Sequence, residues 1–195
     1  LLDFGREISG GVRILCHKAG SGSTVVRIRF GESYGEANAE LGYMGACNDH
    51  SPRDFSATLV NYSDLTFGQT GFRFVRIDFP EGEAVKIKSV YAAFTHYGGE
   101  PIGDFACNDE LINKIYDTAR YTVMLNMQNG VIWDGIKRDR LVWVGDMYPE
   151  VKAILYTYGG EHYREYRAVF RQRLEFQLLH VSRRHEFRVY ERGKL

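Results

Sequence analysis

Hydrophobic and polar residues alternate in several segments of the first half of the chain. In residues 23–32 the alternating positions are Val26, Arg27, Ile28, Arg29 and Phe30. This period of two, with β-branched and aromatic residues, predicts a β-strand. The same texture occurs in residues 10–18, 71–79 and 84–94. Clusters of Gly, Asn, Asp and Ser between the segments predict turns, so residues 1–100 are expected to form a jelly-roll-like β-sandwich.

The apolar pattern changes to helical spacing near Phe105. Apolar residues then recur along one predicted helix face, at Leu111, Ile112, Ile115, Tyr116, Ala119 and Val123. Asn108 is expected to cap this helix, and the acidic Asp109 and Glu110 suit its positive N-terminal end.

A second helix is expected from near Asp146 to the glycines at positions 159 and 160. Pro149 is tolerated in its first turn. Its apolar face contains Val151, Ile154, Leu155 and Tyr158. Two helices cannot enclose a core of their own, so residues 104–195 are expected to begin a helical domain that continues elsewhere or is completed by another chain. The predicted fold class is α+β, with two domains.

Composition and charge exclude several classes of partner. The 195 residues include 25 basic and 25 acidic side chains, so net charge gives no long-range attraction to nucleic acid or to an anionic membrane. No stretch approaches the roughly 20 apolar residues of a membrane span. The cysteines, Cys16, Cys47 and Cys107, are far apart and lack CxxC spacing, which indicates neither a disulfide framework nor a zinc site.

The two ends of the chain carry separate expectations. The first residues have neither an initiator Met nor a signal-peptide pattern, so the chain is expected to begin inside a larger protein, and no compartment is indicated. Residues 171–195 contain seven basic and three acidic residues. They are open to three interpretations: a solvated helix end, which is favoured, a basic contact surface, or sequence not native to the domain.

Some polar clusters outside these segments are interpreted as structural. Asp49, His50 and Asp54 suggest metal ligands, yet Asn, Asp, Ser and Pro at this density are typical of a turn, so neither a metal nor another cofactor is expected. Five histidines lack partners at ligand spacing and are interpreted as surface or core residues: His17, His96, His162, His180 and His185.

Residues 131–150 concentrate charged and aromatic side chains. They contain four acidic residues, three basic residues and two tryptophans: Asp134, Asp139, Asp146, Glu150, Lys137, Arg138, Arg140, Trp133 and Trp143. Taken alone, the stretch is best interpreted as a loop between helices, whose charges pair with one another and whose tryptophans cover the edge of a core.

The order of six short motifs makes the sequence more specific. Along the chain they read "LDFGREISGGVRI", "VRIRFGES", "DHSPRD", "TGFRFVRID", "FACNDELINKIY" and "DGIKRDRLVWVGDMYPE". In this order they resemble the bacterial α-L-rhamnosidases of glycoside hydrolase family 78. The resemblance implies a β-sandwich followed by an (α/α)6 barrel, of which this chain would hold the end of the first and the start of the second.

The resemblance also implies a reaction, the inverting hydrolysis of a terminal α-L-rhamnose. In such a reaction one carboxyl group protonates the leaving oxygen and another activates water, and the two groups stand roughly 6.5–9.5 Å apart. The implied partner is a rhamnose-containing glycoside or polysaccharide. The general base lies far downstream in relatives, so this chain alone is expected to be inactive.

Four residues match the family's sugar-binding positions. Asp134, Arg138, Trp143 and Asp146 are implied ligands of the rhamnose ring. Carboxylates that accept from sugar hydroxyls make charge-assisted hydrogen bonds, and Trp143 could pack against the C6 methyl group. All four are expected to converge on one concave surface.

The general acid departs from the family pattern. The commoner pattern is Arg-Asp-Glu-Arg with the Glu as acid, whereas this sequence reads Arg138, Asp139, Arg140. Asp139 is the nearest candidate, but its pKa would have to be raised by burial, and the flanking arginines would lower it. Glu150 is a weaker candidate.

Two alternatives to this function stay open. One is a carbohydrate-binding β-sandwich protein that has a vestigial helical part and no catalytic activity. The other is a related hydrolase that acts on another deoxysugar or on a uronate.

Overall fold

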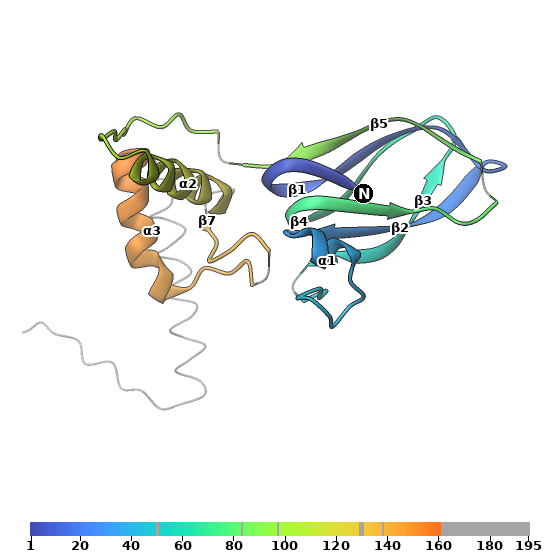
Figure 1. The fold of residues 1–195 in the computed structure, drawn as a ribbon, viewed down its shortest axis with the longest axis horizontal. Helices are drawn as coiled ribbons and strands as arrows, with labels where there is room; N and C mark the ends of the chain where they lie inside the picture. Colours follow the sequence, from blue (N-terminus) through green and yellow to red (C-terminus); the bar gives the residue numbers. More distant parts are fainter. Residues whose placement is uncertain (50, 83, 97, 129–130, 138, 161–195) are drawn as a thin grey trace, which may run out of the picture.

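The structure is a computed structural model that describes residues 1–49, 51–82, 84–96, 98–128, 131–137 and 139–160. Its five long strands lie in one half of the molecule, and its two longer helices lie in the other together with a short strand (Figure 1). In chain order the elements are β1 (Leu2–Ala19), β2 (Ser23–Gly31), α1 (Tyr34–Asn38), β3 (Asp54–Val60), β4 (Ser63–Asp78), β5 (Val85–Phe94), α2 (Glu110–Asn126), β6 (Met127–Gln128), β7 (Val131–Ile132) and α3 (Val144–Thr157).

Five strands form one antiparallel sheet in the order β3-β2-β4-β1-β5. The four segments with period-two texture all lie in strands, which confirms those predictions. The sequence predicts a sandwich, whereas β1 to β5 belong to one sheet, and β6 and β7 form a separate two-stranded sheet. β1 nevertheless contacts β3, although two strands separate them in the sheet, so the sheet folds over on itself. Alternation cannot distinguish these arrangements, because both bury one face of each strand.

The folded sheet encloses the main hydrophobic core. Val26, Ile28 and Phe30 of β2 are at most 2% exposed, and Phe72 of β4 packs edge-on against Phe30. Complete burial of such side chains stabilises a fold by about 1.5–3 kcal/mol each. The sheet formed by β1 to β5 is therefore a stable framework for the loops and helices that contact it.

The segment between β2 and β3 contains a short helix, α1, where the sequence predicts only turns. Ser33 caps it by accepting a hydrogen bond from the backbone N–H of Glu36 at 3.1 Å. The Glu36 carboxylate accepts in return from the N–H of Glu32 at 2.9 Å. This Ser-x-x-Glu spacing is a capping-box signal, and it could have predicted the helix.

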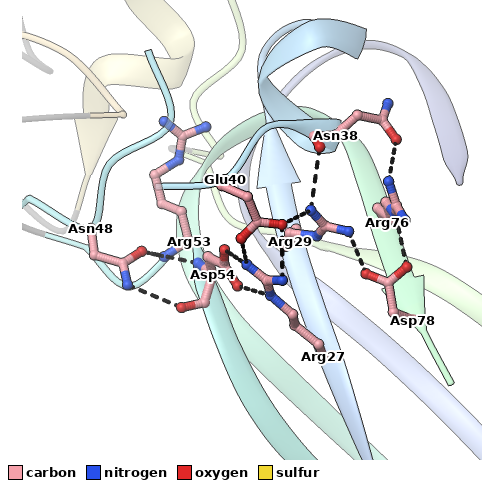
Figure 2. A network of polar contacts seen from close by, with 9 residues as sticks. All are labelled: Arg27, Arg29, Asn38, Glu40, Asn48, Arg53, Asp54, Arg76 and Asp78. Carbon is pink, nitrogen blue, oxygen red and sulfur yellow. Dashed lines mark hydrogen bonds and ion pairs between the residues drawn. The ribbon is translucent and has the colours of Figure 1, made fainter. Parts of the chain in front are cut away.

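A network of arginines and carboxylates fastens this segment to the sheet (Figure 2). Arg27 of β2 binds Asp54 bidentately and also pairs with Glu40. The side chain of Arg29 is only 5% exposed, and it pairs with Asp78 at the end of β4 at 2.6 Å. Buried guanidinium groups are stable only when paired, so the network holds α1 and the residues after it in one position.

α2 and α3 confirm the two predicted helices, with corrections at their N-termini. Asp109, not Asn108, caps α2: its carboxylate accepts from the N–H groups of Leu111 and Ile112. Asn108 lies one residue too early for its side chain to reach those groups. α3 begins directly after Trp143 and has no side-chain cap. Gly159, in the left-handed region at φ 82°, ends α3 as predicted.

The helical part has a small core and a large exposed apolar face. Residues of the core are Met127, Ile132, Val142, Ile154 and Tyr158. Leu111, Ile112 and Ile115 of α2 are 46–66% exposed. Among the described residues, no helix is both long and apolar enough to cross a membrane.

The helical part lies directly against the sheet. The hydroxyl of Tyr121 in α2 donates to the backbone carbonyl of Glu7 in β1. The buried amide of Gln128 donates to the side-chain oxygen of Ser9 and to the carbonyl of Thr95. These bonds connect α2 and β6 to the end of the sheet that faces the helices (Figure 1).

Candidate functional site

The charged stretch forms a closed loop between β7 and α3, which we call the charged loop (residues 133–143). The backbone N–H of Asp134 donates to the carbonyl of Leu141 at 3.0 Å, and the N–H of Leu141 donates to Oδ1 of Asp134 at 2.9 Å. These two bonds tie the start of the loop to its end. Asp134 is therefore a structural residue of the loop as well as a candidate ligand.

Two side chains attach the loop to β4. Ile136 is 7% exposed and packs on Gly71, where an added Cβ would lie 2.6 Å from its Cγ1. The guanidinium of Arg140 donates to the carbonyl of Gln69 at 2.7 Å and lies 4.3 Å above the ring of Trp133. Arg140 adopts φ 52°, a left-handed conformation uncommon for residues with a side chain.

Lys137 attaches the loop to the segment that follows β2. Its Nζ lies 2.9 Å from Glu32 and 3.1 Å from Glu36. The described basic residues of the loop thus pair with the sheet part, whereas the sequence taken alone favours pairing within the stretch. Partners fifty or more positions away leave no local signal in the sequence.

Glu150 in α3 is influenced by two other carboxyl groups. Glu150 is half-buried, and burial raises its pKa to about 7, helped by the negative charges of Asp146 and Asp134. Both charges therefore lie near enough to Glu150 to disfavour its ionised form. Asp146 lies in the first turn of α3, where the positive end of the helix favours a carboxylate.

The remaining predicted site residues are Trp143, Asp139 and Arg138. Trp143 is 46% exposed and directly precedes α3, three residues before Asp146. Asp139 lies half-exposed in the turn of the charged loop. Arg138 is outside the described residues. The charges of Asp134 and Asp146 thus act on the same third carboxyl group, that of Glu150.

Two hollows adjoin this carboxyl cluster. A cleft of about 590 Å³ between the sheet and α2 is lined by Asp134 together with Arg6, Glu7, Glu32, Asp117 and Tyr121, among others. A largely apolar groove of about 650 Å³ between α2 and α3 is lined by Glu150. Asn126 borders both, and its buried side-chain oxygen has no hydrogen-bond partner within the described part of the chain. Carboxyl and amide oxygens at these hollows are suited to accept from hydroxyl groups.

The polar residues that β1 and α2 contribute to the cleft were not predicted as site residues. They come from β1, which is far from the charged loop in sequence, and from α2, while Glu32 directly follows β2. The only sequence signal for Glu7 is its place in the motif "LDFGREISGGVRI".

Glu7 has an unusual environment within the cleft. Its pKa is raised to about 8, first by burial and then by the nearby carboxylates of Glu32 and Glu36, against the opposing charges of Arg53 and Lys137. At neutral pH Glu7 is therefore protonated, which leaves two carboxylates beside two cations. The cluster is electrically balanced only in this state.

This balance predicts how stability depends on pH. A carboxyl whose pKa is higher in the folded chain stabilises the fold fully below its unfolded pKa near 4.5, and this contribution is lost as pH rises through about 8. Glu7→Gln stays neutral and avoids the loss. Because solvent screening reduces the effect at a partly buried site, we expect Glu7→Gln to be more stable than wild type at pH 9 by about 1 kcal/mol, or about 2–4 °C in Tm.

Thermal unfolding of both proteins at pH 5, 7 and 9 measures this difference. Glu81→Gln, which changes an exposed residue between β4 and β5, is the matched control. Its difference in Tm from wild type should be the same at all three pH values. A constant Tm difference for Glu7→Gln across this range would contradict the assignment.

Among the described residues, no group of three or more His, Cys, Asp and Glu side chains could hold a metal ion. The carboxylate of Asp54 is bound by Arg27, and His50 lies outside the described residues. His17 packs edge-on against Tyr62, and the ring of His96 lies tilted against that of Phe94, with 4.5 Å between the ring centres. His162, His180, His185 and the whole of residues 171–195 also lie outside the described residues.

Comparison with known proteins points to one family. Residues 100–175, which include the charged loop and α3, match the family model described as the bacterial α-L-rhamnosidase 6 hairpin glycosidase domain. An α-L-rhamnosidase of Formosa agariphila is 25% identical over 182 residues, covering 85% of this chain and 18% of that protein.

Solved structures agree with this match. The GH78 rhamnosidase of Bacillus sp. GL1 superposes with a TM-score of 0.64 at 22% identity, over 80% of this chain and 16% of its own. A rhamnosidase from Klebsiella oxytoca with rhamnose bound superposes with a TM-score of 0.62 at 17% identity, over 82% of this chain and 33% of its own. The resemblance to the family 78 α-L-rhamnosidases is confirmed.

The α-L-rhamnosidases are much longer than this chain. It spans about a fifth of the curated relative and no more than a third of either solved structure. The family match includes Asp134, Asp139, Trp143, Asp146 and Glu150, so every candidate residue of the charged loop and α3 lies inside the glycosidase region.

Proposed function

We propose that this chain is part of an α-L-rhamnosidase, an inverting glycoside hydrolase that removes terminal α-L-rhamnose. The observation that supports this most strongly is the electrostatic interaction of Glu150 with Asp134 and Asp146, three carboxyl groups of the charged loop and α3 inside the region that matches the rhamnosidase family. A glycosidase needs such groups both to bind hydroxyls and to transfer protons.

Each residue has a proposed role. Asp134 and Asp146 accept hydrogen bonds from vicinal hydroxyls of the sugar, with Arg138 as a further polar ligand, and Trp143 covers the apolar side of the ring. Asp139 is the proposed general acid because of its place in the motif. Glu150 is the second candidate, because a carboxyl with a pKa of about 7 holds a proton at the pH where the reaction runs.

The proposed division of the chain is a sheet domain over residues 1–100 and the start of an (α/α)6 barrel over residues 104–195. The exposed apolar residues of α2 and the groove beside α3 support this proposal, because further barrel helices would cover them. The general base would be supplied by a later part of the barrel.

The proposal predicts different results for the chain and for the full-length protein. The 195-residue chain should show no measurable turnover of an aryl α-L-rhamnoside, because it lacks the base and most of the barrel wall. The full-length protein should hydrolyse this substrate and invert the anomeric configuration, which NMR of the first product reports.

A panel of aryl glycosides tests the sugar. Preferred turnover of another deoxysugar or of a uronide by the full-length protein would refute the assignment to rhamnose. Saturable sugar binding without turnover of any member would refute the enzyme and favour a carbohydrate-binding protein. Turnover by the short chain itself would refute the predicted missing base.

A further inference from the structure

Lys137 connects the charged loop to two carboxylates of the sheet part. Its side chain is 23% exposed, and its Nζ is within 3.1 Å of both Glu32 and Glu36. Burial acts against its charge, but the hydrogen bonds to Glu32 and Glu36 outweigh burial and raise its pKa, so the ammonium group stays charged. Lys137 is therefore paired with two carboxylates at once, one of which, Glu36, is buried.

The acceptor Glu36 is fixed independently of the loop. Its side chain is 3% exposed, pairs with the equally buried Arg53, and accepts from the N–H of Glu32. Arg53 in turn bonds to the backbone of Phe30 in the main core. Removal of Lys137 would therefore leave Glu36 still paired with Arg53, and the sheet part should keep its fold.

Lys137 lies between the two proposed functional carboxylates of the loop. It follows Asp134 by three residues and precedes Asp139 by two. Asp134 is hydrogen-bonded to Leu141 across the loop. A shift of the turn that contains Lys137 would therefore move Asp134 and Leu141 together. Ile136 and Arg140 hold the loop on β4, whereas Lys137 pairs with Glu32 and with Glu36 of α1.

We propose that Lys137 is a positioning residue. Its ammonium group is held by Glu32 and Glu36, and this pairing fixes the charged loop in the position beside α1 that the proposed sugar site requires. The inference rests on the proposed rhamnosidase function for its consequence on catalysis. The attachment of the loop to the sheet part can be tested without that function.

Intrinsic fluorescence tests the attachment in the 195-residue chain. Its two tryptophans, Trp133 and Trp143, begin and end the charged loop, so all tryptophan emission reports on this loop. In Lys137→Met, local opening should raise the acrylamide quenching constant about twofold, with the circular dichroism spectrum unchanged. Lys137→Arg should restore the quenching, and Lys88→Met, which removes an exposed charge from β5, should not change it.

Kinetics of the full-length protein tests the positioning role. A misplacement of about 1 Å can cost as much as 10²-fold, so Lys137→Met should lower kcat on an aryl α-L-rhamnoside about 10- to 100-fold. KM should change much less, and Lys137→Arg should recover most of kcat. A merely destabilised protein would instead lose active fraction on heating while kcat per folded molecule stayed constant.

The outcomes separate the two proposals. If wild-type full-length protein does not hydrolyse rhamnosides, the proposed function fails, and the quenching data still decide whether Lys137 holds the loop. If Lys137→Met quenches like wild type, the attachment is refuted. If its quenching rises while kcat is unchanged, the loop is attached there but Lys137 does not position the site.

Discussion

Asp139→Asn in the full-length protein should slow hydrolysis of an alkyl α-L-rhamnoside about 10²- to 10⁴-fold, the usual contribution of a general acid. The loss should be small for a dinitrophenyl α-L-rhamnoside, because such a leaving group departs without protonation. Asparagine has the size of aspartate but no proton to transfer at neutral pH. Rates on both substrates, measured at saturating concentration, give the comparison.

Glu150→Gln is the matched variant, because Glu150 is the carboxyl in the cluster whose pKa is raised to about 7. If Asp139 is the acid, Glu150→Gln should depend little on the leaving group. The reverse pattern, with a large loss only in Glu150→Gln, would refute Asp139. In that case the wild-type rate should also fall as pH rises above about 7, and the variant should lack this dependence.

Asp134→Ala should lower kcat/KM on an aryl α-L-rhamnoside about 10- to 100-fold, which corresponds to one lost charge-assisted hydrogen bond of about 1.5–3 kcal/mol. The bond tightens on the sugar hydroxyls in the transition state, so kcat should fall and not only KM rise. The structure adds a second loss, since Asp134 also accepts from the N–H of Leu141.

Asp134→Asn separates these two losses. Its amide oxygen can still accept from Leu141, so the loop should stay closed, whereas the negative charge offered to the sugar is gone. We expect Asn to retain wild-type tryptophan fluorescence and to lose less activity than Ala. Wild-type kcat/KM in both variants would mean that Asp134 serves only the loop.

Much of the fold could be predicted from the pattern of apolar residues. Period two identified strand segments whose core residues are fully buried, and helical spacing identified α2 and α3. The single folded sheet could not be predicted, because it depends on pairing between β4 and both β1 and β2. The capping residue of α2 was misplaced by one position, a normal error where Asn and Asp are adjacent.

The site was predictable only where its residues are close in sequence. Asp134, Asp146 and Glu150 all lie within the single motif "DGIKRDRLVWVGDMYPE", so the sequence could point to all three. Glu7, Glu32 and Glu36 are over ninety positions from the loop, and in the sequence they look like ordinary acidic residues beside strands. Their role depends on burial and on Lys137, which only the three-dimensional arrangement supplies.

The contact between Gly71 and Ile136 restricts how this family of sequences can vary. A methyl group at position 71 would overlap the side chain of Ile136, because its carbon would lie 2.6 Å from Cγ1 and 3.0 Å from Cδ1 of that residue. The two positions therefore cannot change independently: a side chain at 71 demands a smaller residue at 136. Related sequences should show covariation between these positions, and a chimera that joins the sheet of one relative to the charged loop of another should need both residues from the same parent.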